Sequence, residues 1–84
     1  MSRMRVRVRL FASLREAAGR PEVVLDLSPG ASAEDAWRAL TAGHPSLAAK
    51  RANLAASVNR GYAPFDTRLE DGDEVVFIPP VSGG

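Results

Sequence analysis

The sequence has 84 residues, a net charge of +1 and no cysteine, which predicts one domain, residues 1–84, with a small core. Disulfides, thiolate metal sites and a cysteine nucleophile are excluded, and the near-neutral charge argues against nucleic acid or an acidic membrane as a partner. Because no apolar run is long enough to span a bilayer or to form a secretory leader, we expect a cytoplasmic protein.

Two half-buried strands are expected in the first third of the chain. Residues 4–11 and 22–27 alternate apolar and polar side chains, a period of two that is typical of strands with one face against a core. The three arginines of the first run therefore belong to a solvated face or, alternatively, to a surface that attracts an acidic partner. Between the runs we expect a short helix over residues 12–18, with Ser13 and Glu16 as its capping box.

One longer helix is expected after the turn at residues 28–30. Ser32 has the side chain of an N-cap, and Asp35 stands in the first turn, where the helix dipole favours an acid. One apolar face with the spacing i, i+3, i+4 and i+7 predicts that this helix packs on a sheet. The residues of that face are Ala33, Ala36, Trp37 and Leu40. The tripeptide Gly-His-Pro at residues 43–45 ends the helix.

The second half of the chain contains three further strand patterns. We expect a third strand over residues 54–59 and a last strand over residues 74–78. A short strand over residues 62–65 is confined to a sheet edge, because Pro64 cannot donate a hydrogen bond to a ladder. Leu69, in the bend between them, is expected to fill the core.

These elements predict an α+β fold with a single mixed sheet and one main helix packed on one face. In the last strand, alternation directs Val75 and Phe77 to the core, and Val76 and Ile78 to the opposite face. If the first and last strands are neighbours, Phe11 joins the two outward residues. Three large apolar side chains together on a surface indicate a contact site for another protein.

The chain ends in Pro79-Pro80-Val81-Ser82-Gly83-Gly84, and this tail, residues 79–84, is the most informative segment for function. Its two prolines favour a stiff, extended backbone, and its two glycines leave the tip without side chains. Such a tip can enter a narrow channel in another protein, where a side chain would clash. A frayed terminus is the alternative interpretation.

Conventional catalytic and metal-binding patterns are absent from the sequence. The single histidine, His44, stands in the helix-ending tripeptide, and there is no phosphate-binding loop, dinucleotide turn or histidine pair for zinc. The reactive group that remains is the terminal carboxylate of Gly84. A partner that uses ATP could convert it to an acyl-adenylate, from which a sulfur or amine nucleophile could displace AMP. The sequence therefore predicts a carrier whose reactive group is its own main-chain end.

Three parts of the sequence resemble the MoaD family, the small subunits of molybdopterin synthase. They are the run GDEVVFIPPVSGG that ends at Gly84, the run RLFASLREAAG that begins at Arg9, and Asn59 after the third strand. The resemblance covers essentially the whole chain and implies a ubiquitin-like β-grasp fold. It also implies that an adenylyltransferase related to ubiquitin-activating enzymes charges Gly84, and that a sulfurtransferase then converts the terminus to a thiocarboxylate.

For function, the resemblance implies a sulfur carrier that is the small subunit of molybdopterin synthase. Its tail would insert into the large subunit, within a heterotetramer of two small and two large subunits. There it would donate sulfur to cyclic pyranopterin monophosphate to form the molybdopterin dithiolene. Catalytic side chains would lie in the large subunit, no cofactor would be bound here, and ATP would be used by the activating partner. Phe11, Val76 and Ile78 would contact the large subunit.

Three other interpretations stay open. The same terminus suits a sulfur carrier for thiamine or for tRNA thiolation, although the Pro-Pro-Val-Ser-Gly-Gly ending and the outward apolar residues favour the molybdopterin pathway. It also suits a protein modifier that forms isopeptide bonds through Gly84. The third interpretation is a binding domain with an inert tail.

Overall fold

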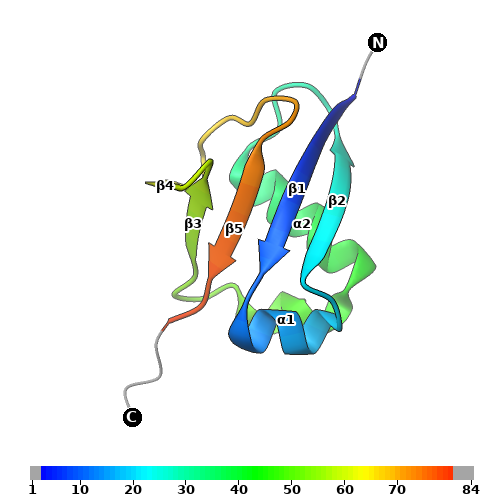
Figure 1. The fold of residues 1–84 in the computed structure, drawn as a ribbon, viewed down its shortest axis with the longest axis vertical. Helices are drawn as coiled ribbons and strands as arrows, with labels where there is room; N and C mark the ends of the chain where they lie inside the picture. Colours follow the sequence, from blue (N-terminus) through cyan, green and yellow to red (C-terminus); the bar gives the residue numbers. More distant parts are fainter. Residues whose placement is uncertain (1–2, 81–84) are drawn as a thin grey trace.

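The computed structural model describes residues 3–80, which form one mixed sheet with its helices behind it and at its lower end (Figure 1). The strands are β1 (Met4–Leu10), β2 (Glu22–Leu27), β3 (Ala55–Val58), β4 (Gly61–Ala63) and β5 (Glu74–Ile78). The helices are α1 (Ala12–Ala18), α2 (Ala33–Gly43) and the 3-10 helix η1 (Pro45–Lys50). Among these described residues, no helix has the length and apolar character needed to cross a bilayer.

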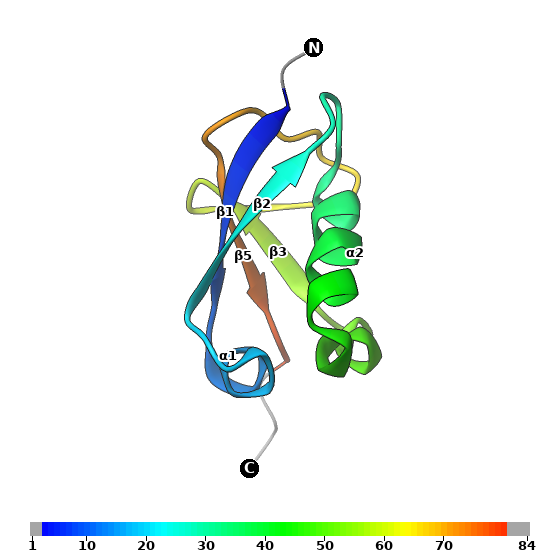
Figure 2. The same cartoon turned by 90° about the vertical axis from the view of Figure 1, so that its right-hand side faces the viewer.

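The last strand of the chain lies in the middle of the sheet, whose strand order is β2-β1-β5-β3-β4. β5 runs parallel to β1 and antiparallel to β3, and both edge strands pair antiparallel with their neighbours. α2 crosses one face of this sheet, and none of the helices in residues 3–80 covers the opposite face (Figure 2). The prediction of an α+β fold with a mixed sheet and one main helix on one face is confirmed.

Burial follows the alternation that the sequence shows. In β1 the apolar residues are buried and the three arginines are exposed. In β5, Val75 and Phe77 are fully buried, whereas Val76 and Ile78 are half-buried on the other face. Val23, Leu25 and Leu27 of β2 also pack against the core, and Leu69 is buried in it as expected. A period of two therefore places one complete side of each of these strands under α2.

α2 begins at the N-cap that the sequence predicts. The Ser32 hydroxyl accepts a hydrogen bond from the backbone N–H of Asp35, and the Asp35 carboxylate accepts one from the backbone N–H of Ser32, at 3.2 and 2.9 Å. This is a complete capping box. The apolar face is buried, and Trp37 meets Phe77 edge to face with 5.1 Å between ring centroids. Phe65 stacks against the same phenylalanine at 5.9 Å, so the core centres on the β5 ring.

The capping box expected at Ser13 and Glu16 is wrong. Phe11 is the N-cap of α1, its backbone is extended (φ −131°, ψ 160°), and no side chain caps the helix. The extended backbone of β1 continues through Phe11, and Ala12 then turns the chain with a φ of +51°. α1 therefore begins at Ala12, one residue before Ser13, so Ser13 cannot be its N-cap. The start of α1 is set by the end of β1, which is fixed by its pairing with neighbouring strands.

The β3–β4 hairpin differs from the prediction, since β3 is shorter and β4 begins one residue earlier and ends at Ala63 instead of residue 65. Asn59 and Arg60 both have positive φ, 51° and 74°, so these two residues form the tight turn of the hairpin. The Asn59 side chain donates to the Asp73 carboxylate at 2.9 Å and accepts from the backbone N–H of Glu74 at 3.0 Å. These bonds tie the hairpin to the first residue of β5.

An ion pair joins the first turn of α2 to the segment before β3. The Arg51 guanidinium donates to both carboxylate oxygens of Glu34, with a shortest N–O distance of 2.6 Å. Its Cζ atom also lies 3.6 Å from the ring centroid of Phe65. The hydrogen bond from Arg51 is the main cause that lowers the pKa of Glu34 below its ordinary value. The fold therefore favours the charged form of this carboxyl group.

Acid should weaken the fold through this pair. Because the pKa of Glu34 is lower in the folded state, its stabilisation is complete above the ordinary glutamate pKa of about 4.3 and is lost as the pH falls through the lower folded value. Glu34→Gln should therefore unfold at lower urea than the parent at pH 7, and this difference should shrink as the pH falls. Urea titrations across this pH range measure it; a difference that stays constant with pH would contradict the assignment.

Candidate functional site

The base of the tail lies at the end of the central strand. β5 ends at Ile78, after which Pro79 is half-buried and Pro80 is exposed. Prolines have no N–H to donate, so they cannot extend the ladder. The chain also leaves β1 and enters β3 at this level, next to positive φ angles at Ala12 (51°) and Asn53 (61°). The chain therefore leaves the sheet at its lower end in Figure 1, where β1 and β5 end and the antiparallel β3 begins.

Four of the predicted tail residues lie outside the residues that the structure describes: Val81, Ser82, Gly83 and Gly84. Their roles stay predictions. Pro79 and Pro80 are described, and they occupy the position that a stiff connection between the sheet and the final residues requires. The site is therefore built from this connection and from the sheet surface beside it.

The three outward residues of the sequence prediction come together on the face of the sheet opposite α2. The β1–β5 register pairs Leu10 with Phe77, so the next residues, Phe11 and Ile78, lie side by side. Phe11 is 47% exposed, and Val76 shares the outward face of β5 with Ile78. The sequence predicted this grouping on the condition that the first and last strands are neighbours, and β1 and β5 are paired in the sheet.

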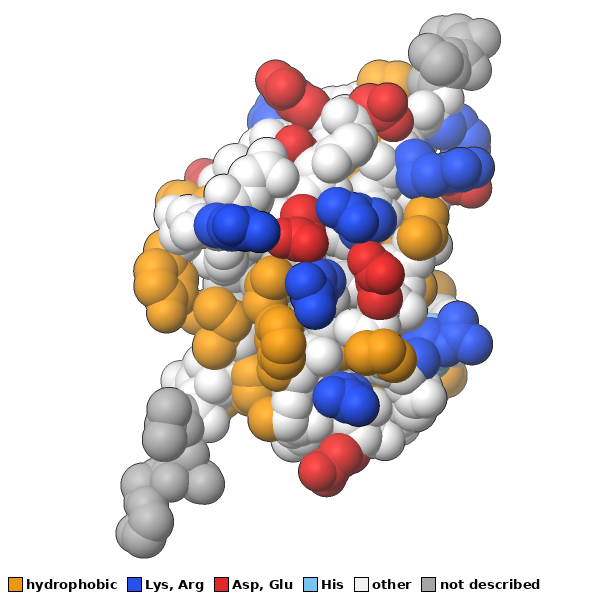
Figure 3. All heavy atoms as spheres, viewed as in Figure 1, with side chains coloured by type: hydrophobic (Ala, Val, Ile, Leu, Met, Phe, Trp, Pro, Cys, Tyr) orange, Lys and Arg blue, Asp and Glu red, His pale blue; other side chains and the backbone are white. Residues whose placement is uncertain are grey.

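Tyr62 also belongs to this surface, and the sequence reasoning missed it. It is 81% exposed, and the pairing of Ser57 with both Tyr62 and Val76 places it in the same row as Val76. We name this surface the outer patch; its residues are Phe11, Ala55, Tyr62, Val76 and Ile78. In Figure 3 apolar side chains gather on this part of the face, around the lower ends of β3 and β5. The position of Tyr62 beside Val76 follows from the strand pairing and has no signal in the local sequence pattern.

Charged side chains cover the rest of the same face. Arg5 lies 3.4 Å from Asp26, and Arg7 lies 3.9 Å from both Glu22 and Glu74. Exposed pairs of this kind contribute little to stability. Figure 3 shows these charged side chains over the upper part of the face. Val24, which is 53% exposed and pairs with Arg7, is a single apolar residue among them and lies apart from the outer patch.

The clustered acids near the start of β5 serve the turn that precedes the strand. Asp71 accepts a hydrogen bond from the backbone N–H of Arg5 at 2.7 Å, and Asp73 accepts one from the backbone N–H of Glu70 at 2.8 Å. Within residues 3–80, no three histidine, aspartate or glutamate side chains come together in a group that could hold a metal ion. The acids near β5 are therefore explained by the hydrogen bonds that they accept from backbone N–H groups.

The mixed sheet with its last strand in the centre and α2 across one face defines a ubiquitin-like β-grasp protein. A solved ubiquitin from Caldiarchaeum subterraneum has the same fold, with a TM-score of 0.63 and 16% identity, over 99% of this chain and all of that one. Within this class the chain belongs to the ThiS family, whose model matches residues 8–84.

Relatives match the chain over nearly its full length. The molybdopterin synthase sulfur carrier subunit of Chlamydomonas reinhardtii is 41% identical over 83 residues, covering 96% of this chain and 100% of the relative. The protein of the same name from Escherichia coli is 40% identical, covering 94% and 99%. The crystal structure of SAMP1 from Haloferax volcanii has a TM-score of 0.87 at 32% identity, covering 95% and 99%.

Proposed function

We propose that this protein is a sulfur carrier and the small subunit of a molybdopterin synthase. The observation that carries this proposal is the end-to-end similarity to molybdopterin synthase sulfur carrier subunits, at up to 41% identity. The geometry supports it, because the central strand leads into Pro79 and Pro80, the base of the tail, beside an exposed apolar patch. The reactive group is then the main-chain carboxylate of Gly84.

The chemistry follows from the low reactivity of a carboxylate. A partner enzyme lets a Gly84 carboxylate oxygen attack the α-phosphorus of ATP, which forms an acyl-adenylate and releases pyrophosphate. Hydrosulfide, delivered by a sulfurtransferase, then attacks the carbonyl carbon, and the C–O bond to AMP breaks. The terminus is now a thiocarboxylate. ATP binds to the activating partner, and this chain holds no cofactor.

The second half of the cycle takes place in the large subunit. The tail, residues 79–84, enters its active site, and the thiocarboxylate sulfur bonds to cyclic pyranopterin monophosphate while it is still joined to the Gly84 carbonyl. Water then attacks this carbonyl carbon and the C–S bond breaks, which leaves the sulfur on the pterin and returns Gly84 to a carboxylate. A dithiolene needs two sulfurs, so two charged carriers serve each product, in a heterotetramer of two small and two large subunits. Catalytic side chains lie in the large subunit.

A second candidate function is that of a protein modifier joined to lysine through Gly84. The similarity to SAMP1, a small archaeal modifier protein of Haloferax volcanii, favours it, since the two proteins are 33% identical over 84 residues. The activated terminus is chemically the same in both cases. The two functions differ only in whether sulfur or a lysine amine displaces AMP.

Intact-mass measurement separates these functions. The protein is incubated with the activating enzyme, ATP and a sulfur donor, and then with the large subunit and pyranopterin precursor. A carrier gains the mass difference between one sulfur and one oxygen atom and then supports dithiolene formation. A modifier instead appears as much heavier conjugates. A terminus that keeps its original mass under these conditions contradicts both functions.

Phe11→Arg should weaken binding to the large subunit without unfolding the protein. The Phe11 side chain is nearly half exposed and belongs to the outer patch, so a charge there is tolerated in the free protein but is costly to bury in an interface. We expect an increase in Kd of about tenfold or more, measured by calorimetry. Val24→Arg is the matched control, because Val24 is 53% exposed on β2, pairs with Arg7 and lies outside the outer patch. Equal Kd values for the two variants would place the interface elsewhere.

A further inference from the structure

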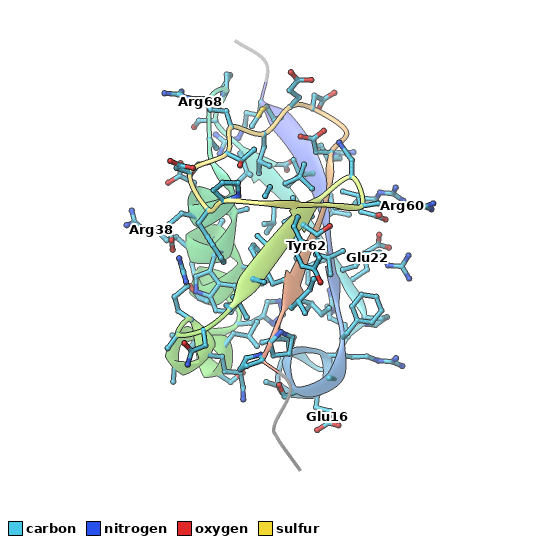
Figure 4. The ribbon with its side chains drawn as sticks, turned by 90° about the vertical axis from the view of Figure 1, so that its left-hand side faces the viewer. Glu16, Glu22, Arg38, Arg60, Tyr62 and Arg68 are labelled. Carbon is cyan, nitrogen blue, oxygen red and sulfur yellow. The ribbon has the colours of Figure 1, made fainter. Side chains whose placement is uncertain are left out.

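Positive charge borders the outer patch on two sides. Arg9 lies in the same row as Val76, because the β1–β5 register pairs these two residues, and its guanidinium carbon is 5.7 Å from the ring centroid of Phe11. Arg60 lies in the turn that leads into β4, two residues before Tyr62. Figure 4 shows Arg60 and Tyr62 on the same hairpin. Both arginines are exposed.

The acid between this border and the outer patch, Glu74 of β5, is largely covered. Glu74 lies 3.9 Å from both Arg7 and Arg9, and its side chain is only 18% exposed. The side chains of the two arginines are 57% and 51% exposed. The guanidinium groups therefore face solvent, whereas the carboxylate lies beneath them. Glu22, which pairs with Arg9 and is 42% exposed, lies on β2, on the side of Arg9 away from the outer patch. The exposed charge that directly adjoins the patch at β1 is therefore positive.

We propose that the outer patch docks on an apolar surface bordered by carboxylates, with Arg9 and Arg60 facing those carboxylates. This rests on the proposed function, which makes the partner the large subunit of molybdopterin synthase. Charges at the rim of an interface mainly raise the association rate and fix orientation, while the apolar centre sets the dissociation rate. Arg9 lies on β1 and Arg60 in the turn between β3 and β4, so together they select one orientation of the partner relative to the base of the tail.

The test measures association rates with the large subunit by stopped flow over a range of salt concentrations. Arg9→Gln combined with Arg60→Gln removes two charges and keeps side chains that can hydrogen-bond. At low salt we expect association about three- to tenfold slower than for the parent, a weaker dependence on salt, and a dissociation rate that changes much less. Arg60→Gln alone should show part of the effect.

Arg38→Gln is the matched control for Arg60→Gln. Arg38 is an exposed arginine on α2, and Figure 4 shows it on the helix side of the molecule, away from Arg60 and Tyr62. The Arg38→Gln variant should associate with the large subunit at the same rate as the parent. The proposal is overturned if the double variant associates as fast as the parent, or faster, or if Arg38→Gln slows association equally.

Failure of this inference can be told apart from failure of the proposed function. Sulfur transfer by the parent protein, measured at saturating large subunit, tests the proposed function separately from the association rates. If the parent protein transfers no sulfur, the proposed function fails, whatever the association rates are. If the parent transfers sulfur but the loss of the two charges does not affect association, the proposed function stands and only the inference of carboxylates around the partner's docking surface is wrong.

Discussion

One alanine added after Gly84 should abolish sulfur transfer and leave the folded protein unchanged. The extra residue moves the terminal carboxylate by up to about 3.5 Å and replaces a glycine tip with a side chain. A misplacement of about 1 Å can already cost about a hundredfold in rate, so we expect a loss of at least that size. The measurement is dithiolene formation with activating enzyme, ATP, sulfur donor and large subunit.

The control for this prediction has the same length and composition, with the alanine inserted after Met1 instead. Both proteins should unfold at the same urea concentration, because neither insertion touches the buried residues of the core. If the protein extended at Gly84 transferred sulfur as fast as the control, the reactive carbonyl would not be the last one, and the carrier mechanism would be wrong.

Trp37→Ala should be the most damaging single change to stability. Trp37 is 3% exposed and packs edge to face on Phe77, the ring at the centre of the core. Removing a buried aromatic side chain costs ~3–5 kcal/mol, whereas a chain of this size has a total stability of roughly 4–12 kcal/mol at the usual contribution per residue. We expect a protein that is partly or wholly unfolded at 25 °C.

Circular dichroism with urea is the appropriate measurement, since Trp37 is the single tryptophan and the variant has no tryptophan fluorescence. Tyr62→Ala is the matched control: it also removes a large aromatic ring, but from a residue that is 81% exposed. Its free energy of unfolding should stay within about 0.5 kcal/mol of the parent. Similar losses in both variants would mean that the core does not centre on the contact between α2 and β5.

Local sequence patterns predicted the structure correctly wherever it depends on residues within a single helix or strand. The Ser32 cap and the apolar face of α2 were predicted correctly because a helix fixes which residues share a face. The alternation of β1 and β5 was predicted for the same reason. The Ser13 cap was wrong because α1 begins where β1 ends, at Ala12, and the end of a strand depends on its partners.

By itself, the sequence determined the strands, the main helix and the chemical nature of the tail, because periodicity, capping residues and a Gly-Gly ending are properties of neighbouring residues. Only the tertiary structure decided that β5 lies between β1 and β3. That insertion places Phe11 beside Ile78 and adds Tyr62 to the same surface, although these residues are far apart along the chain. Strand pairing depends on contacts over long sequence distances, and no local pattern specifies which edges meet.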